Sequence, residues 1–337
     1  MTIARFIREQ PAALDRSVEA ARAFASAPGI GPFDGIALVG SGSSFNALQV
    51  ARPRFVAARR GSVGLHEPGD FAAELACLDA KPLVIVLSQS GASTTSILAA
   101  KAALAAGMPT LAITAALDAP LASCGARVLH LPVGDEPVGP KTKGFTSSMA
   151  TLFLVAEALG APPSEAMSGA ALAALIEPAA ETARALAASL ADVDAIVVAG
   201  RRANHGIALE ASLKIAEMSG VPTAAWATEE LLHGRLHGLT PKSIAIVIAE
   251  GGDESAEAEQ ARAAMARRGC RVFVVDAAGA PGPAGLARPA SPWSALGLVL
   301  PFQWLAVFLA EARGLAPEAM RHGSLSRELA IKTHAEP

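Results

Sequence analysis

Three ionisable side chains recur at helical spacing beyond the middle of the chain. Glu210, Lys214 and Glu217 fall at positions i, i+4 and i+7 of residues 207–219, a segment of helix-forming composition. They therefore lie on one face of the expected helix. On a solvated surface such a stripe contributes only about 0.2–0.5 kcal/mol per pair. In a cleft, a carboxylate beside a lysine can move a proton between adjacent carbons of a sugar.

A histidine follows at the expected end of the next short helix. The sequence EELLHG begins at Glu229 and places His233 directly before a glycine. A lone histidine is more often structural, but imidazole titrates near neutrality and suits the opening of a hemiacetal ring. His237 is a less specific neighbour.

Two loops rich in small hydroxyl residues follow apolar runs in the first half of the chain. GSGSSFN (residues 40–46) follows residues 34–39, and SQSGAS (residues 88–93) follows residues 81–87. A strand that ends in such a loop and turns into a helix offers hydroxyls, an amide and helix N-terminal N–H groups to one anion. Neither loop has a nucleotide-binding fingerprint, so we expect a phosphate cradle rather than a nucleotide site.

The apolar runs that position these residues occur in two similar sets. The first set lies at residues 34–39, 83–87, 109–114 and 128–131, and the second at residues 194–199, 243–249 and 271–276. Matching segments are offset by 160, 161 and 162 residues. Strands that alternate with Ala-rich helical patterns indicate βαβ units. We therefore expect an α/β protein of two tandem, doubly wound, parallel-sheet, flavodoxin-like domains.

The expected boundaries follow from these sets. They are an N-terminal helix over residues 1–28, a first domain over 29–167, a helical linker over 168–190, a second domain over 191–314 and a C-terminal tail over 315–337. Only the first copy carries hydroxyl-rich strand ends. The first copy is therefore expected to bind the anion, and the second to supply acid and base.

The composition and net charge of the chain exclude several classes of binding partner. The 337 residues carry a net charge of −3 without a long basic run, so neither nucleic acid nor an anionic membrane surface is expected. Cys77, Cys124 and Cys270 lack the spacing of a disulfide framework or a zinc site, which favours a reducing cytoplasm and predicts no metal and no cofactor. Residues 294–310 are apolar but interrupted by Pro301 and Gln303, and a buried helix is preferred to a membrane span.

Five motifs together resemble the double sugar-isomerase (SIS) domain family. They are GSGSSFNA at Gly40, LSQSGAS at Leu87, VGPKTKGFT at Val138, IALEASLKIAEMS at Ile207 and EELLHG at Glu229. The resemblance spans residues 34–312. It is nearest to the isomerase half of glucosamine-6-phosphate synthase and to stand-alone deaminases and deglycases built on the same module.

The resemblance implies roles for matching positions. The phosphate of a sugar phosphate would be held by Ser43, Ser44, Ser88, Gln89, Ser90 and Ser93, and Thr142 and Lys143 would line the same pocket. Glu217 would shuttle a proton between C1 and C2, supported by Glu210 and Lys214. His233 would open the ring in the site of a neighbouring subunit, which implies a homodimer.

The chain departs from the synthase pattern at both ends. Residues 1–33 are too short for a glutaminase domain and contain no cysteine, so glutamine-dependent amination is not expected. The family's tail lysine forms a Schiff base with the ketose. Here the best local match is Arg327, whose guanidinium cannot be that nucleophile, and Lys332 fits only after a shift of register.

The resemblance favours a cytoplasmic phosphosugar isomerase that converts an aminosugar phosphate, such as glucosamine 6-phosphate, to a ketose phosphate with release of ammonia. Three alternatives stay open. They are a fructose-amino-acid-6-phosphate deglycase, a plain aldose–ketose phosphate isomerase and a non-catalytic sugar-phosphate sensor.

Overall fold

A computed structural model describes residues 2–25, 32–77, 80–276 and 291–333. The chain forms two compact units, each built around one sheet. The five-stranded unit takes the described residues of Ala12–Glu136, Lys143–Ser164 and His322–Pro337. The four-stranded unit takes those of Met1–Pro11, Pro137–Thr142 and Glu165–Arg321. Each unit therefore draws on segments that are far apart in the sequence.

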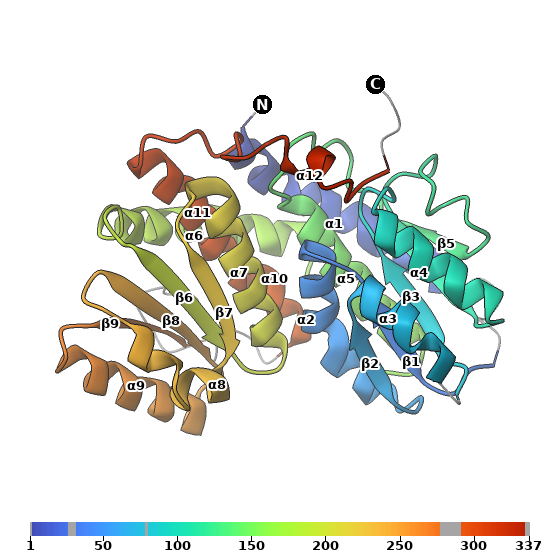
Figure 1. Cartoon of the computed structure of the whole chain (residues 1–337), viewed down its shortest axis with the longest axis horizontal. Helices are drawn as coiled ribbons and strands as arrows, with labels where there is room; N and C mark the ends of the chain where they lie inside the picture. Colours follow the sequence, from blue (N-terminus) through green and yellow to red (C-terminus); the bar gives the residue numbers. More distant parts are fainter. Residues whose placement is uncertain (1, 26–31, 78–79, 277–290, 334–337) are drawn as a thin grey trace. The chain divides into compact units, whose positions relative to one another are not determined.

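The five-stranded unit has a wholly parallel sheet in the order β2-β1-β3-β4-β5 (Figure 1). Its strands are β1 (Ile36–Val39), β2 (Val63–His66), β3 (Leu83–Leu87), β4 (Thr110–Thr114) and β5 (Arg127–His130). Its helices are α2 (Ser43–Ala57), α3 (Pro68–Glu74), α4 (Thr94–Ala105), α5 (Lys143–Ala158) and α12 (Leu325–Glu328), with a 3₁₀ turn at Leu75–Cys77. Alternation of strand and helix along the chain gives this doubly wound topology.

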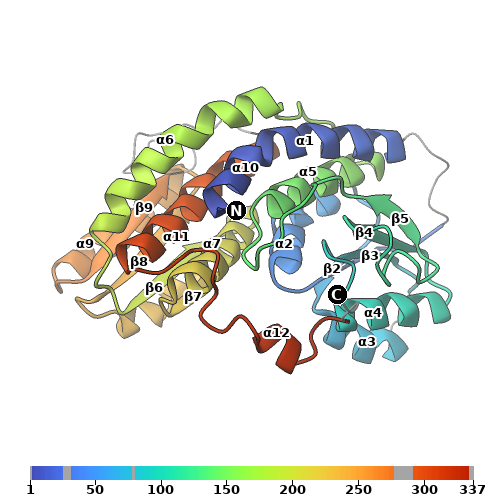
Figure 2. The same ribbon diagram turned by 90° about the horizontal axis from the view of Figure 1, so that it is seen from above.

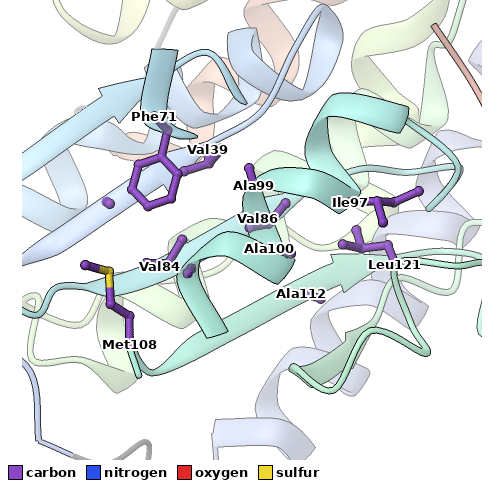
Figure 3. Close-up of a cluster of buried hydrophobic side chains, with 12 residues drawn as sticks. Val39, Phe71, Val84, Val86, Ile97, Ala99, Ala100, Met108, Ala112 and Leu121 are labelled. Carbon is purple, nitrogen blue, oxygen red and sulfur yellow. The ribbon is translucent and has the colours of Figure 1, made fainter. Parts of the chain in front are cut away.

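Both faces of this sheet are covered, because every residue of β1, β3 and β4 is buried. One face packs against α3 and α4, where Phe71 and Ile97 meet alternate strand residues such as Val84 and Val86 (Figure 3). The other face carries α2, and α5 packs on α2. This core fixes the strand ends from which the hydroxyl-rich loops leave.

The four-stranded unit repeats the arrangement with the parallel order β7-β6-β8-β9. Its strands are β6 (Ala195–Gly200), β7 (Thr223–Ala227), β8 (Ser243–Ala249) and β9 (Arg271–Asp276). Its helices include α6 (Gly169–Ala188), α7 (Ala203–Ser219), α8 (Thr228–Leu232) and α9 (Gly252–Ala266), with a 3₁₀ turn at Arg235–Gly238. One face of this sheet is covered by α8 and α9.

The predicted duplication is confirmed, because equivalent strands take equivalent places in both sheets. The likeness extends to single backbone angles. Gly42, before α2, has φ 56° and ψ −134°, and Arg202, 160 positions later and before α7, has φ 50° and ψ −120°. The second copy therefore holds an arginine in a conformation that favours glycine.

Two long helical segments complete the units. α1 (Ile3–Ala25) opens the chain, and its first residues belong to the four-stranded unit. Near the other end, a 3₁₀ turn (Pro292–Ser294), α10 (Ala295–Leu298) and α11 (Leu300–Ala312) follow one another, and α11 lies beside α6 and α7 (Figure 2). Pro292–Ala312 is long and apolar enough to cross a membrane, but its 18-residue apolar window is entirely buried. This burial is what the sequence predicted for the segment.

Candidate functional site

The two hydroxyl-rich loops leave neighbouring strands of the five-stranded sheet. β1 pairs with β3 in register Val39 to Val86, and the strand order reverses at this pair. Open α/β sheets bind ligands at such a switch point, beyond the carboxyl ends of the strands. The backbones are close enough that a Cβ added to Gly40 would lie 3.3 Å from the carbonyl oxygen of Leu87. The predicted pair of loops is thus brought together.

The loop after β3 is shaped by its own side chains. Ser93 caps α4 by accepting from the N–H of Ser96 at 3.5 Å, and the hydroxyl of Ser90 accepts from the N–H of Ala92 at 3.3 Å. Gly91 has φ +63°, and an added Cβ would lie 2.8 Å from Oγ1 of Thr114. Only glycine satisfies both conditions. Ser88 is buried where β3 ends.

The loop after β1 delivers two serines to the first turn of α2. The helix begins at Ser43, and the N–H of Ser44 donates to the carbonyl of Ser41 at 3.2 Å. Gly42 precedes them with a positive φ, and no atom lies within 4 Å of a Cβ added there. First-turn N–H groups and serine hydroxyls suit an anion at this end of the helix.

A buried carboxylate links the loop after β3 to the start of α5. Glu136, 5% exposed, accepts through Oε1 from the N–H of Lys143 at 3.1 Å and through Oε2 from the N–H of Gly144 at 3.2 Å. Oε2 also accepts from Nε2 of Gln89 at 3.3 Å. The first turn of a helix favours a negative charge, which explains a buried glutamate here. Gln89 and Lys143, both predicted site residues, therefore share one partner.

The residue before Lys143 is held separately, within the four-stranded unit. The carbonyl of Thr142 accepts from Nε2 of Gln303 at 3.4 Å, and Oε1 of Gln303 accepts from Gln10 at 2.8 Å. All three residues are fully buried. Gln303 is one of the two residues that interrupt the apolar run of α11. Its amide serves to fix the Thr142 backbone.

The C-terminal tail lies against the loop after β3. Lys332 forms an isolated antiparallel bridge with Ser93, and the N–H of Thr333 donates to the carbonyl of Ala92 at 2.7 Å. The N–H of Thr94 donates to the carbonyl of Ile331 at 3.2 Å. Arg327 lies in α12 and is exposed. The backbone of Lys332, rather than that of Arg327, is thus placed beside the predicted phosphate loop.

The three ionisable residues of α7 form a buried ion cluster in the four-stranded unit. Nζ of Lys214 lies 3.6 Å from Oε1 of Glu210 and 2.5 Å from Oε2 of Glu217. The side chains of Glu210 and Lys214 are 0% and 1% exposed, whereas that of Glu217 is 23% exposed. This excludes a solvated stripe. The carboxylate of Glu217 alone among the three reaches solvent, and the buried ammonium group of Lys214 holds it in place.

His233 belongs to the same four-stranded unit. It caps the C-terminus of α8, is 74% exposed, and places Nε2 3.2 Å from Oε1 of Glu229. Glu229 also contacts Arg201 at 3.2 Å. Among the residues that the structure describes, no group of three His, Cys, Asp or Glu side chains is arranged to hold a metal ion.

Sequence reasoning missed Glu136 and the role of Gln303. Glu136 lies seven positions before Lys143, where α5 begins, which is outside the spacing of a capping motif. No local sequence signal therefore marks it. An amide in the middle of the apolar α11 was noticed only as an interruption. In a buried helix a polar side chain needs a partner, and that requirement is a signal for a structural contact.

Comparison with known proteins places these features in one family. The model of the SIS domain matches residues 34–160 and 189–281, one match in each copy of the repeat. Each match includes the strand and helix starts described above.

Three individual proteins illustrate this similarity. Glutamine–fructose-6-phosphate aminotransferase (isomerizing) of Tropheryma whipplei strain Twist is 28% identical over 228 residues, which cover 64% of this chain and 37% of that enzyme. The crystal structure of glucosamine-6-phosphate deaminase from Thermotoga maritima has a TM-score of 0.78 at 21% identity, covering 94% of this chain and 97% of that one. Tagatose-6-phosphate ketose/aldose isomerase from Escherichia coli has a TM-score of 0.78 at 19% identity, covering 100% and 96%. The two solved structures share the fold of this chain.

Proposed function

Because this chain belongs to the SIS domain family, we propose that it is a phosphosugar isomerase acting on an aminosugar phosphate, with release of ammonia as in a glucosamine-6-phosphate deaminase. The substrate would be a 2-amino-2-deoxy hexose 6-phosphate, and the products a ketose 6-phosphate and ammonia. Relatives named for hexosamine and ketose phosphates support this class of substrate.

The observation that carries the proposal is the ion cluster of α7. Glu217 is the one member with solvent access, and Lys214 holds its carboxylate at 2.5 Å. The negative charge of Glu210 compensates the positive charge of Lys214, so the three side chains together carry one net negative charge. A carboxylate that is fixed in place and partly desolvated suits repeated uptake and release of a proton.

The reaction balances with this single carboxylate. His233 assists opening of the C1–O5 hemiacetal to the free aldehyde. Glu217 removes the C2 proton while the aldehyde oxygen takes up a proton, which gives an enolamine. Glu217 returns its proton to C1 and the amino group loses one, which gives the imine of the ketose. Water adds to the imine carbon at C2, and the carbinolamine expels ammonia to leave the ketone. No electron donor or acceptor is needed.

The hydroxyl-rich loops would hold the phosphate group. Ser43 and Ser44 open α2, and the loop of residues 88–93 opens α4, so hydroxyls and helix N-termini serve one anion. In the covalent form of this reaction, the amine of Lys332 displaces ammonia from the imine carbon to form a Schiff base, and water then releases the ketone. The bridge between Lys332 and Ser93 supports that assignment over Arg327.

We further propose a homodimer in which His233 serves the partner's site. Its 74% exposure and its position at the end of α8 support this role. A cytoplasmic location belongs to the same proposal, because a phosphorylated sugar is its substrate.

The experiment is turnover of glucosamine 6-phosphate, with ammonia and fructose 6-phosphate measured separately. We expect Glu217→Gln to lower kcat by about 10²–10⁴-fold, the range of general acid–base catalysis, while sugar-phosphate binding persists. Glu259→Gln, on the exposed side of α9, is the matched control and should keep wild-type turnover.

Wild-type protein that releases neither product, with Glu217→Gln indistinguishable from it, would exclude this function. Ketose formation without ammonia from unaminated hexose phosphates would identify a plain aldose–ketose isomerase. Turnover of fructosamine 6-phosphates alone would identify a deglycase.

A further inference from the structure

The buried carboxylate of Glu136 belongs to no step of the proposed reaction, although it contacts two predicted site residues. It lies in the loop between β5 and α5, and it is 5% exposed. Two of its hydrogen bonds come from the backbone of α5 and one from the side chain of Gln89. We propose that Glu136 is a positioning residue that sets the orientation of Gln89 for the phosphate group, an inference that rests on the proposed function.

The first step of the argument concerns the amide of Gln89. An amide group can be turned by 180° with little change of shape, so its donor and acceptor ends need a partner that distinguishes them. The carboxylate of Glu136 accepts only, and therefore it selects Nε2 of Gln89 at 3.3 Å. The acceptor end, Oε1, is then fixed as well. The remaining N–H of Gln89 has a defined direction for a phosphate oxygen.

The second step concerns the backbone that holds the carboxylate. Oε1 of Glu136 accepts from Lys143, and Oε2 accepts from both Gly144 and Gln89. Charge-assisted bonds from the first turn of α5 keep Glu136 from rotating away. The Gln89 side chain also lies directly against Gly144, where an added Cβ would overlap its amide group. Gly144 therefore admits Gln89 by close approach, and Glu136 orients it.

The test is a double-mutant cycle on ligand binding. Calorimetry measures the affinity for glucosamine 6-phosphate and for inorganic phosphate in wild type, Glu136→Ala, Gln89→Ala and the double variant. We expect each single substitution to weaken binding about tenfold, the usual effect of losing a hydrogen bond to a charged group. If Glu136 acts through Gln89, the double variant is weaker than either single variant by no more than about twofold.

Conservative variants separate positioning from folding. In Glu136→Gln the amide oxygen can take the place of Oε2, which keeps the bonds from Gly144 and Gln89 and loses the one from Lys143. It should bind within about threefold of wild type. Gly144→Ala should weaken binding without a change in charge. Asp135→Asn, the exposed neighbouring carboxylate, is the matched control and should bind like wild type.

A measurement without ligand keeps the two proposals distinguishable. The side-chain amide of Gln89, assigned in ¹⁵N spectra by its loss in Gln89→Ala, should exchange slowly with water in wild type and Asp135→Asn, and rapidly in Glu136→Ala. If wild type binds neither probe while this contrast holds, the proposed function fails together with the phosphate-binding purpose of Gln89, whereas the orientation of Gln89 by Glu136 stands. Unchanged exchange in Glu136→Ala, affinity within twofold of wild type, or multiplicative effects in the cycle would overturn the positioning role.

Discussion

At the scale of single residues, the sequence predicts which side chains share a face but not whether that face is buried. The spacing of Glu210, Lys214 and Glu217 is compatible with a solvated stripe, and the structure instead buries the first two completely. α7 packs against β6, against β7 and against α11, which is distant in sequence. No local sequence pattern shows whether this face of α7 is buried. The proposed role of the cluster depends on that burial.

Lys214→Met should destabilise the fold strongly. The substitution removes the ammonium group that lies 3.6 Å from Oε1 of Glu210, a side chain with 0% exposure, and so breaks a buried ion pair from one side. Breaking a buried ion pair from one side costs about 3–5 kcal/mol. Urea denaturation should show this loss, and Glu210→Gln added to Lys214→Met should recover part of it. The exposed Lys101→Met control should change stability by less than about 0.5 kcal/mol.

His205 should make the fold sensitive to acid. Burial lowers the pKa of this imidazole in the first turn of α7. The unfolded chain, in which the pKa is about 6.5, therefore binds the proton more tightly than the folded chain. The stability contribution is complete above that pH and is lost as the pH falls below it.

Urea midpoints measured on both sides of about pH 6.5 test this expectation. Wild type should lose stability on acidification, and His205→Gln should lose less. His237→Gln, an exposed histidine, should keep the wild-type pH dependence. Equal pH dependence of wild type and His205→Gln would exclude a role for His205.

At the scale of elements, the strands were predictable except for one edge strand of each sheet, β2 and β7. β3 and β8 are fully buried and, apart from Ser243 at the start of β8, apolar, which is the pattern of a central parallel strand. β2 and β7 are only partly buried, and they are short segments, VGLH and TAAWA, containing glycine or alanine. Such residues have weak strand preference, so pairing with β1 and β6 decides their conformation.

Arg202→Gly should stabilise the protein. Arg202 takes nearly the same backbone angles as Gly42, in a region that costs a non-glycine residue about 1–3 kcal/mol. Its ion pair with Glu254, at 3.7 Å and with an arginine side chain 72% exposed, offsets little of this. The unfolding free energy should rise by about 1 kcal/mol in urea denaturation.

Arg267→Gly is the matched control for that substitution. Arg267 has φ −61° at the end of α9, an ordinary conformation for any residue. Glycine there should lower stability or leave it unchanged, because it only adds freedom to the unfolded chain. Equal effects at both positions would exclude relief of strain as the cause.

At the scale of the whole molecule, the duplicated architecture was predictable because strand spacing recurs almost constantly along the chain. Which segments of the chain make up each unit could not be predicted from the sequence. Each unit combines segments separated by more than a hundred residues, such as the tail residues that join the five-stranded unit. Contacts of this kind, including the bridge between Ser93 and Lys332, depend on the folded path of the chain.

Mixed dimers would test whether active sites are shared between subunits. Glu217→Gln and His233→Asn should each be inactive alone, if each removes a different part of one site. When the two variants are unfolded, mixed in equal amounts and refolded, half of the dimers should contain one variant of each kind. One of their two sites is then intact, which restores about a quarter of wild-type activity.

Recovery should follow the proportions of the two variants and disappear when either is mixed only with itself. A mixture that stays inactive, although heterodimers are demonstrated by differential tags, would place Glu217 and His233 of one site in the same subunit.

The tail's attachment has a consequence for how such proteins diverge. Ile331 and Thr333 are joined to Thr94 and Ala92 by main-chain hydrogen bonds, which any amino acid other than proline can make. Selection can therefore exchange the tail's side chains while its path is retained. A reactive lysine could migrate by several positions during evolution and still arrive at the same loop. Alignment of tails by residue identity would then misassign it, whereas alignment by the atoms that bond to the loop would compare it with Lys332.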